Sequence, residues 1–164
     1  MTKPVIRNAY NPDLSKINAW VQQLVEHVKT TRDVYVNAMS DEYIGEYAEW
    51  FSQAIFDRDV IVLIAEIDQI SVGFLQGKIE QPFIASSQIQ TIGHIEMCWV
   101  DIEYRRDGIA QALVAEAESW FRRKQVSYVD VNYIVGNQQA ETAWPNMGYT
   151  TYRLSARKCL DADD

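Results

Sequence analysis

The sequence predicts a single-domain α/β fold, with a mixed, mostly antiparallel sheet of six to seven strands and about four flanking helices. Two observations lead to this fold class. Three strand-like apolar runs follow one another between residues 60 and 102 with no helical segment between them, which indicates antiparallel pairing. A strand, a helix and another strand then follow over residues 96–134, which indicates a parallel crossover.

The first elements are a strand and two amphipathic helices. Residues 5–10 form the predicted strand, and Asn11-Pro12-Asp13 follows as a helix start, with Asn11 as N-cap and Pro12 at the first helical position. Apolar residues recur at helical spacing over residues 14–28. A second helix is expected after Ser40, because apolar residues line one face over residues 44–55.

The remaining elements complete the sheet. Strands are predicted at residues 60–67 and 70–79, joined by a short turn at Asp68-Gln69, and at residues 90–102. A helix from residue 109, a strand at 128–134, a short helix at 137–147 and a last strand at 149–158 follow. We find no repeat or linker, so we expect one domain over residues 1–160 and an acidic tail at 161–164.

The net charge, the apolar runs and the cysteine and histidine content limit the partners and sites that we expect for this protein. The net charge of −8 argues against a nucleic-acid partner and mildly favours a cationic small molecule or peptide, although solubility alone also explains it. The longest apolar run is far below the roughly 20 residues of a membrane helix, and the first residues do not resemble a signal peptide. We therefore expect a cytoplasmic protein with no membrane partner. Cys98 and Cys159 are expected to be reduced, and His27 and His94 have no ligand-spaced companions, so no metal site is predicted.

The junction before the helix at residue 109 carries the strongest chemical signal. Arg105, Arg106, Asp107 and Gly108 stand between a strand and a helix. A helix start leaves backbone N–H groups without partners, and glycine lets a ligand approach the backbone closely. With two arginines beside them, these groups suit a phosphate or pyrophosphate. The alternative is a solvated turn with a glycine hinge.

Two motifs resemble those of the GNAT N-acetyltransferase superfamily. Val100-x-Ile102-x-Tyr104-Arg105-Arg106-x-Gly108-Ile109-Ala110 is similar to its acetyl-CoA motif, Gln/Arg-x-x-Gly-x-Gly/Ala after a strand. Asn137-x-x-Ala140, followed by Gly148-Tyr149, is similar to its second signature. The predicted order of elements also matches, so the resemblance covers residues 5–158.

The resemblance implies an acetyl-CoA cleft between two splayed strands. Backbone groups at Val100 and Ile102 are expected to pair with the pantetheine arm, and Asn137 is expected to hold that arm near its amide or thiol end. The residues expected to wrap the pyrophosphate are Arg105, Arg106, Asp107, Gly108, Ile109 and Ala110.

Acetyl transfer to an amine requires removal of a proton, because a free amine is mostly protonated near pH 7. His94, Glu96 and Cys98 alternate along one predicted strand and are expected to share a face. The resemblance implies that Glu96 is the catalytic base, acting through water. The alternatives are that Glu96 pairs with an arginine or a hydroxyl, that His94 assists or is a buried structural residue, and that Cys98 packs in the core.

One position departs from the family pattern. Many relatives have a tyrosine about seven residues after the asparagine, which protonates the departing thiolate; here Trp144 stands there and cannot act as an acid. Tyr104, Tyr133, Tyr149 or water are the alternatives, or no acid is needed.

The predicted function is acetyl-CoA-dependent N-acetyl transfer to a primary amine of a small molecule or peptide, by direct attack in a ternary complex. The acceptor is expected near the two early helices, where carboxylates and aromatic side chains are frequent. The alternative is an acyl-CoA-binding module without turnover. The resemblance also makes a homodimer through late strands plausible.

Overall fold

The computed structural model describes residues 3–39 and 42–160 and contains a five-stranded sheet in the order β1-β2-β3-β4-β5. The first four strands pair antiparallel and β5 pairs parallel with β4, which confirms the predicted mixed sheet and crossover. The sheet has five strands in the described residues, not six to seven. The strands are β1 (Val5–Asn8), β2 (Val60–Ile67), β3 (Ile70–Glu80), β4 (Ile92–Val100) and β5 (Val129–Val131).

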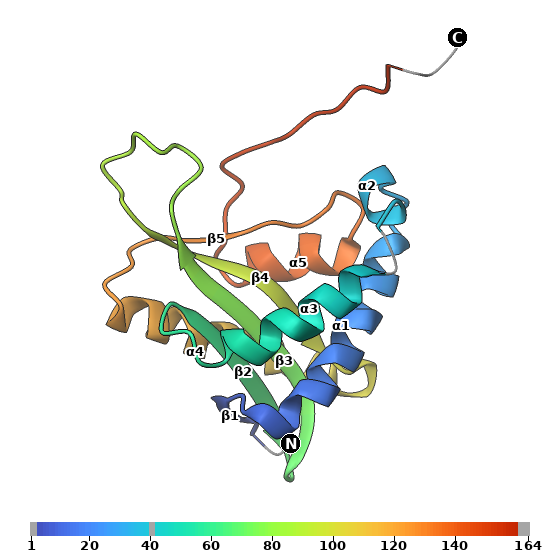
Figure 1. Ribbon diagram of the computed structural model, residues 1–164, viewed down its shortest axis with the longest axis vertical. Helices are drawn as coiled ribbons and strands as arrows, with labels where there is room; N and C mark the ends of the chain where they lie inside the picture. Colours follow the sequence, from blue (N-terminus) through green and yellow to red (C-terminus); the bar gives the residue numbers. More distant parts are fainter. Residues whose placement is uncertain (1–2, 40–41, 161–164) are drawn as a thin grey trace.

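Helices cover both faces of this sheet (Figure 1). The long helices α1 and α3 lie on one face, and α4 and α5 lie on the other. The short helix α2 lies between α1 and α3, where the sequence analysis predicts no helix. Ser40, after which the second long helix was expected, lies outside the described residues. The helices are α1 (Leu14–Lys29), α2 (Val34–Asn37), α3 (Glu42–Ala54), α4 (Ile109–Arg123) and α5 (Gln138–Asn146).

The central strands are apolar on both faces because each face has its own core. In β2, Ile61 and Leu63 pack toward α4, whereas Val62 and Ile64 pack toward α1 and α3. Alternate residues of a strand point to opposite faces, so a continuous apolar run is what a strand covered on both sides requires. The two cores hold β4 in place between them, and β4 carries Glu96 and Val100 of the predicted site.

The start of the first helix differs from the prediction. Residues Asn11–Asp13 form a 3-10 turn, and α1 begins at Leu14. The Asp13 carboxylate, rather than Asn11, accepts the free backbone N–H of Tyr10 at 3.0 Å. The same carboxylate accepts two bonds from the Arg7 guanidinium, at 2.7 and 2.8 Å. A buried carboxylate with these partners fixes β1 against the start of α1.

A β-bulge in β4 changes the direction of its side chains. Gln76 of β3 pairs with Met97, but Gly77 pairs with Ile95, so Glu96 has no partner across the strands. An extra residue of this kind shifts the alternation of faces. His94 pairs with Lys78 and shares a face with it, whereas Cys98 packs in the core beneath α4. The expectation that His94, Glu96 and Cys98 share one face is therefore wrong for Cys98.

The end of the chain also differs from the prediction. The last strand expected at residues 149–158 does not form in the described part of the chain, and β5 has three residues rather than seven. Residues 150–160 form no helix or strand; residues 150–154 line a groove beside β5, and the chain beyond them runs away from the sheet (Figure 1). The acidic tail at 161–164 lies outside the described residues.

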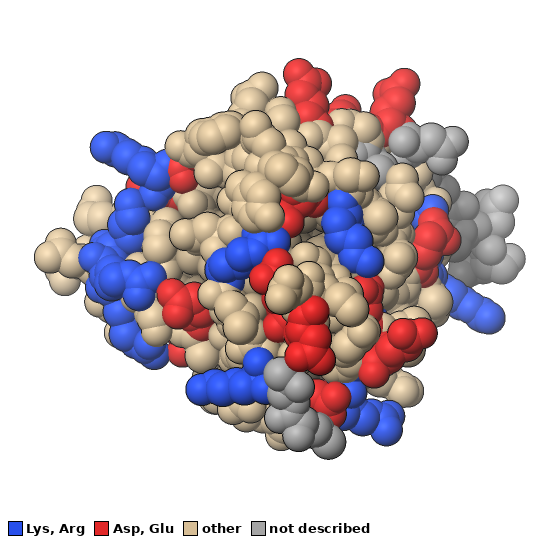
Figure 2. All heavy atoms as spheres, turned by 90° about the horizontal axis from the view of Figure 1, so that it is seen from below, with Lys and Arg blue, Asp and Glu red and all other residues tan. Residues whose placement is uncertain are grey.

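Charges of both signs are interspersed on the face seen in Figure 2, with Lys and Arg beside Asp and Glu rather than in a uniform basic patch. This distribution is unlike the basic surface that binds a nucleic-acid backbone. Within residues 3–39 and 42–160, no helix has the length and apolar character to span a membrane.

Candidate active site

The start of α4 presents free backbone N–H groups. Gly108 precedes the helix in a left-handed conformation with φ of 76°, and Arg106 has φ of 73°. The first backbone hydrogen bond of α4 runs from the N–H of Ala112 to the carbonyl of Gly108. The amides of Ile109, Ala110 and Gln111 have no backbone acceptor among the described residues. Three N–H groups at the positive end of a 15-residue helix are suited to bind an anion.

The space beside Gly108 is open. A Cβ placed there would meet no atom of its surroundings within 4 Å. The left-handed conformation of Arg106 costs about 1 kcal/mol in a residue other than glycine. Arg106 and Asp107 are exposed, so their side chains are free to face an anion or solvent. These features fit a diphosphate that is held by main-chain groups.

The Arg105 side chain folds back onto β4. Its guanidinium lies 4.4 Å from the centre of the Trp99 ring, its Nε donates to the Val100 carbonyl at 2.8 Å, and it also donates to Gln139 Oε1 at 2.8 Å. Burial lowers the pKa of Arg105, and Asp101 opposes this effect. Arg105 thus links β4 to the first turn of α5, and the carbonyl of Val100 is hydrogen-bonded to its guanidinium.

The expected splay of β4 and β5 is present. β5 pairs only with residues Gly93, His94 and Ile95, so β4 is unpaired on this side from Glu96 to Val100. Val100 ends the strand, but Ile102 lies in a 3-10 turn and is exposed. Of the two backbone positions expected to pair with the pantetheine arm, only Val100 thus lies in β4.

Asn137 stands at the start of α5. Its side-chain oxygen accepts the backbone N–H of Ala140 at 3.3 Å, so it caps the helix. The Arg105–Gln139 bond brings this turn beside the end of β4. The structure therefore brings the segment from the end of β4 to the start of α4 beside the start of α5, and the residues expected to bind the cofactor lie along these two stretches of the chain.

Glu96 lies in a separate pocket on the α3 side of the sheet. The pocket has a volume of about 310 Å³ and is lined by Glu46, Tyr47, Trp50, Lys78 and Glu96. The Tyr47 hydroxyl donates to Glu96 Oε1 at 3.4 Å, and Lys78 Nζ lies 3.5 Å from Glu96 Oε2. The bulge in β4 places this carboxylate where it meets side chains of both α3 and β3.

The neighbours of Glu96 keep their ordinary charge states near neutral pH. Burial raises the pKa of Tyr47, and Tyr43 and Glu96 raise it further, so the hydroxyl remains protonated. Burial opposes the charge of Lys78, but Glu96 and Glu80 outweigh burial and hold its pKa above the usual value. Glu96 therefore faces one hydroxyl donor, as the alternative interpretation of the sequence expected, and one ammonium, which belongs to Lys78 rather than to an arginine.

Sequence reasoning missed Lys78 and Glu80. Lys78 Nζ lies 3.2 Å from Glu80 Oε2, and the Glu80 carboxylate is also 3.8 Å from His94 Nδ1. Gln76, Lys78 and Glu80 recur at every second position in an otherwise apolar strand. This polar alternation, beside His94 and Glu96 on the next strand, is a signal from which these residues could have been found.

The candidate acids lie away from Glu96. Trp144 is buried beneath the sheet, with its ring 5.2 Å from the ring of Tyr149. The Tyr149 hydroxyl donates to Glu118 of α4 at 3.2 Å, and Tyr104 packs against the same core. Tyr133 lines a larger groove on the β5 side. None of them lines the pocket of Glu96 in the described part of the chain.

Solved structures with this fold include acetyltransferases. The chain is 20% identical to aminoglycoside 6'-N-acetyltransferase AAC(6')-Ih from Acinetobacter baumannii, with 98% of this chain and all of that chain covered and a TM-score of 0.73. It is 19% identical to a tetramutant of BH1408 from Bacillus halodurans, with coverages of 95% and 99% and a TM-score of 0.82. It is 15% identical to AAC(6')-Iy, solved in complex with CoA, with coverages of 99% and 97% and a TM-score of 0.75.

No curated protein sequence matches the chain well enough to count as a relative. The acetyltransferase (GNAT) family, by contrast, matches over residues 22–149, which include the bulged strand, the α4 junction and Asn137. This match spans more than half of the sequence and agrees with the fold and with both motifs. The chain therefore belongs to the GNAT family of acetyltransferases.

Proposed function

We propose that this protein transfers the acetyl group of acetyl-CoA to a primary amine of a small molecule or peptide, by direct attack in a ternary complex. The observation that carries the proposal is that β4 joins two sites. Its last residue leads to the free amides of α4, and its bulged residue, Glu96, lines a pocket on the α3 side. One strand thus connects an anion site with a carboxylate that can accept a proton.

The residues of the chain have separate tasks in this proposal. Acetyl-CoA supplies the activated acetyl group. The amides of Ile109, Ala110 and Gln111 bind the diphosphate, and the unpaired half of β4 and Asn137 align the arm. Glu96 accepts the proton of the acceptor ammonium, directly or through one water, which is a contribution of about 10²–10⁴ in rate.

The pocket suits a cationic acceptor. Glu46 and Glu96 supply two carboxylates, and the ring of Trp50 offers a face for a cation. Aminoglycosides, which two of the structural neighbours are named for, are small molecules with several primary amines and carry this charge. We therefore propose polyamine-like small molecules as first acceptors to test, with peptide N-termini second.

The test measures release of the CoA thiol from acetyl-CoA with a panel of amines, including kanamycin, spermidine and a peptide with a free N-terminus. We expect turnover with at least one amine, and a loss of about 10²–10⁴ in rate for Glu96→Gln. Glu103→Gln, an exposed carboxylate outside the pocket, is the matched control and should leave the rate unchanged.

A binding module without turnover is the second candidate, and the position of Trp144 favours it, because the buried indole stands where relatives have a tyrosine. The same assay decides between the two functions. Binding of CoA with no thiol release on any amine supports the module and contradicts the enzyme. An unchanged rate in Glu96→Gln would instead remove Glu96 as the base.

A further inference from the structure

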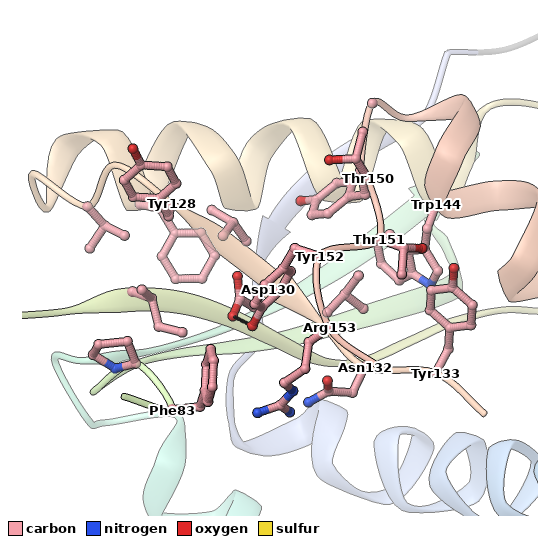
Figure 3. Close-up of a pocket in the computed structure, with 18 of the residues that line it drawn as sticks. Phe83, Tyr128, Asp130, Asn132, Tyr133, Trp144, Thr150, Thr151, Tyr152 and Arg153 are labelled. Carbon is pink, nitrogen blue, oxygen red and sulfur yellow. Dashed lines mark hydrogen bonds between the residues drawn. The ribbon is translucent and has the colours of Figure 1, made fainter. Parts of the chain in front are cut away.

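The acceptor pocket contains a primary amine of the protein itself. Lys78 lines this pocket of about 310 Å³ together with Glu96, and the Lys78 side chain is 32% exposed. The largest groove of the molecule, about 920 Å³ beside β5, is lined by no lysine of the described residues (Figure 3). The described lining of the Glu96 pocket likewise excludes the other lysines of the sequence, Lys3, Lys16, Lys29, Lys124 and Lys158. An amine of the kind that the proposed reaction modifies is therefore already present beside the candidate base.

The register of β3 and β4 sets the position of this amine. Lys78 pairs with His94, and the bulge in β4 turns Glu96 toward the same pocket. Lys78 Nζ consequently lies 3.5 Å from Glu96 Oε2. A general base must lie within hydrogen-bond reach of the group that it deprotonates, or be joined to it by one water. Lys78 therefore has the position relative to Glu96 that the proposed reaction requires of an acceptor nitrogen.

The Lys78 side chain is charged in the resting protein. Partial burial lowers its pKa, but Glu96 and Glu80 raise that pKa by more, with Glu80 Oε2 3.2 Å from Lys78 Nζ. A free acceptor amine also arrives as an ammonium near neutral pH, and Glu96 must remove its proton in the same way. The charge makes a reaction at Lys78 slow, whereas attachment to the protein holds its nitrogen at a high effective concentration. Modification of Lys78 is therefore expected when no other amine competes for the pocket.

We propose that Lys78 is a self-acetylation site, at which the protein transfers an acetyl group from acetyl-CoA to its own lysine when no acceptor fills the pocket. This inference rests on the N-acetyl transfer proposed above. A proton of the Lys78 ammonium passes to Glu96, directly or through one water. The freed lone pair attacks the thioester carbonyl carbon, so that a C–N bond forms and the C–S bond breaks. A second nitrogen proton goes to the departing thiolate, which leaves an amide, the CoA thiol and a protonated Glu96.

Acetylation of Lys78 should inhibit the enzyme. The product is a neutral amide, so the ammonium beside the Glu96 carboxylate is lost. The added acetyl group also occupies part of a pocket of about 310 Å³. Both changes disturb the place where an acceptor must meet Glu96, so the acetylated protein should turn over more slowly. A bound acceptor protects Lys78, and the modification accumulates only when acetyl-CoA is present without substrate.

Peptide mass spectrometry tests the modification. Wild-type protein is incubated with acetyl-CoA alone, and the acetylated fraction of each lysine is followed with time. We expect Lys78 to be acetylated faster than Lys124 by about tenfold or more, because the base is beside it. Lys124 is the matched internal control, since its side chain is 35% exposed, its Nζ lies 4.0 Å from the Asp59 carboxylate and it lines neither pocket. Glu96→Gln should remove this difference, and an excess of a reactive amine from the panel should protect Lys78.

The rate of thiol release after the incubation tests the consequence. Wild-type protein should lose activity toward its best amine in proportion to the fraction acetylated at Lys78. Lys78→Arg keeps the charge but offers no primary amine, so this variant should retain its own initial rate. Lys124→Arg is the matched control and should lose activity as wild type does. A full rate in protein that is acetylated at Lys78 contradicts the inhibition.

The same samples separate this inference from the proposed function. Turnover of an added amine, with Lys78 modified no faster than Lys124, overturns the inference and leaves the proposed function in place. Acetylation of Lys78 that depends on Glu96, without turnover of any added amine, supports the inference and excludes the tested amines as acceptors. A protein that neither modifies Lys78 nor acetylates any amine contradicts both.

Discussion

The chemistry proposed for this protein depends on a few side chains around Glu96. Tyr47 donates to this carboxylate and Lys78 lies 3.5 Å from it, so its charge is stabilised on two sides. Lys78 is therefore a positioning residue in this proposal, because its ammonium and the Tyr47 hydroxyl together fix where the carboxylate lies.

Removal of that ammonium should lower the rate of acetyl transfer. In Lys78→Met the Glu96 carboxylate loses the group 3.5 Å away that helps to fix its position, so we expect kcat for thiol release to fall by up to about 10²-fold. Lys78→Arg keeps the charge and should keep most of the rate. The measurement is thiol release with the best amine of the panel; an equal rate in Lys78→Met and wild type would contradict this role.

Several of these residues could be predicted from the sequence and others could not. Gly108 and the two arginines could be predicted because a helix start and its backbone geometry depend on residues that are neighbours in the sequence. The role expected of Glu96 could be inferred from the resemblance to the family. The bulge that orients its side chain, however, depends on the register between β3 and β4. The pairing of Lys78 with Glu96 depends on the same register, so it appears only in three dimensions.

At the scale of single elements, the junction of β1 and α1 tests whether the charge of Asp13 stabilises the fold. Burial alone would raise the pKa of Asp13, but the bonds from Arg7 and from the Tyr10 amide hold it below the usual value. Asp13→Asn should lower the free energy of unfolding at pH 7 by about 1.5–3 kcal/mol, the range for hydrogen bonds to charged groups.

The sign of the pH dependence follows from the depressed pKa. The stabilisation by Asp13 is complete above the pKa of the unfolded chain, about 3.9, and is lost as the pH falls through the lower pKa of the folded chain. Urea denaturation of wild type and Asp13→Asn should therefore show a gap at pH 7 that closes toward pH 2. A gap of equal size at both pH values would show that Asp13 acts by packing and not by charge.

The contact of β4 with α4 gives a second prediction at this scale. A Cβ at Gly93 would lie 2.7 Å from the ring of Phe121, whereas one at Gly45 of α3 would meet no atom of its surroundings within 4 Å. Gly93→Ala should destabilise the protein by about 1–3 kcal/mol through overpacking. Gly45→Ala should stabilise it by about 0.5–1 kcal/mol, because alanine favours a helix. Equal effects in thermal unfolding would contradict the packing of α4 on β4.

The elements themselves were largely predictable, and the exceptions have physical causes. The central strands and the long helices could be predicted because the spacing of their apolar residues is visible in the sequence. The last strand has the right alternation at residues 150–156, yet a strand requires a partner, and residues 3–39 and 42–160 provide no backbone partner for it. The short helix α2 depends on the Asp33 carboxylate, which accepts the Tyr35 and Val36 amides.

At the scale of the whole molecule, the fold places the two parts of the proposed active site on opposite faces of the sheet. Helices α1 and α3 pack on the face that contains the Glu96 pocket, and α4 presents its free amides from the other face. The half of β4 that does not pair with β5, from Glu96 to Val100, runs from one site toward the other. The family match and the fold therefore support binding of a CoA thioester along this strand.

The binding of CoA tests this account most directly, by isothermal titration of the wild-type chain, Gly108→Glu and Gly148→Glu. Both glycines have positive φ and open surroundings, but only Gly108 stands before the amides of α4. We predict that CoA binds to wild type and Gly148→Glu with similar affinity, and at least 100-fold more weakly to Gly108→Glu, whose carboxylate repels the diphosphate. An absence of heat with wild type, or equal binding to all three proteins, would contradict the claim that these amides hold the cofactor.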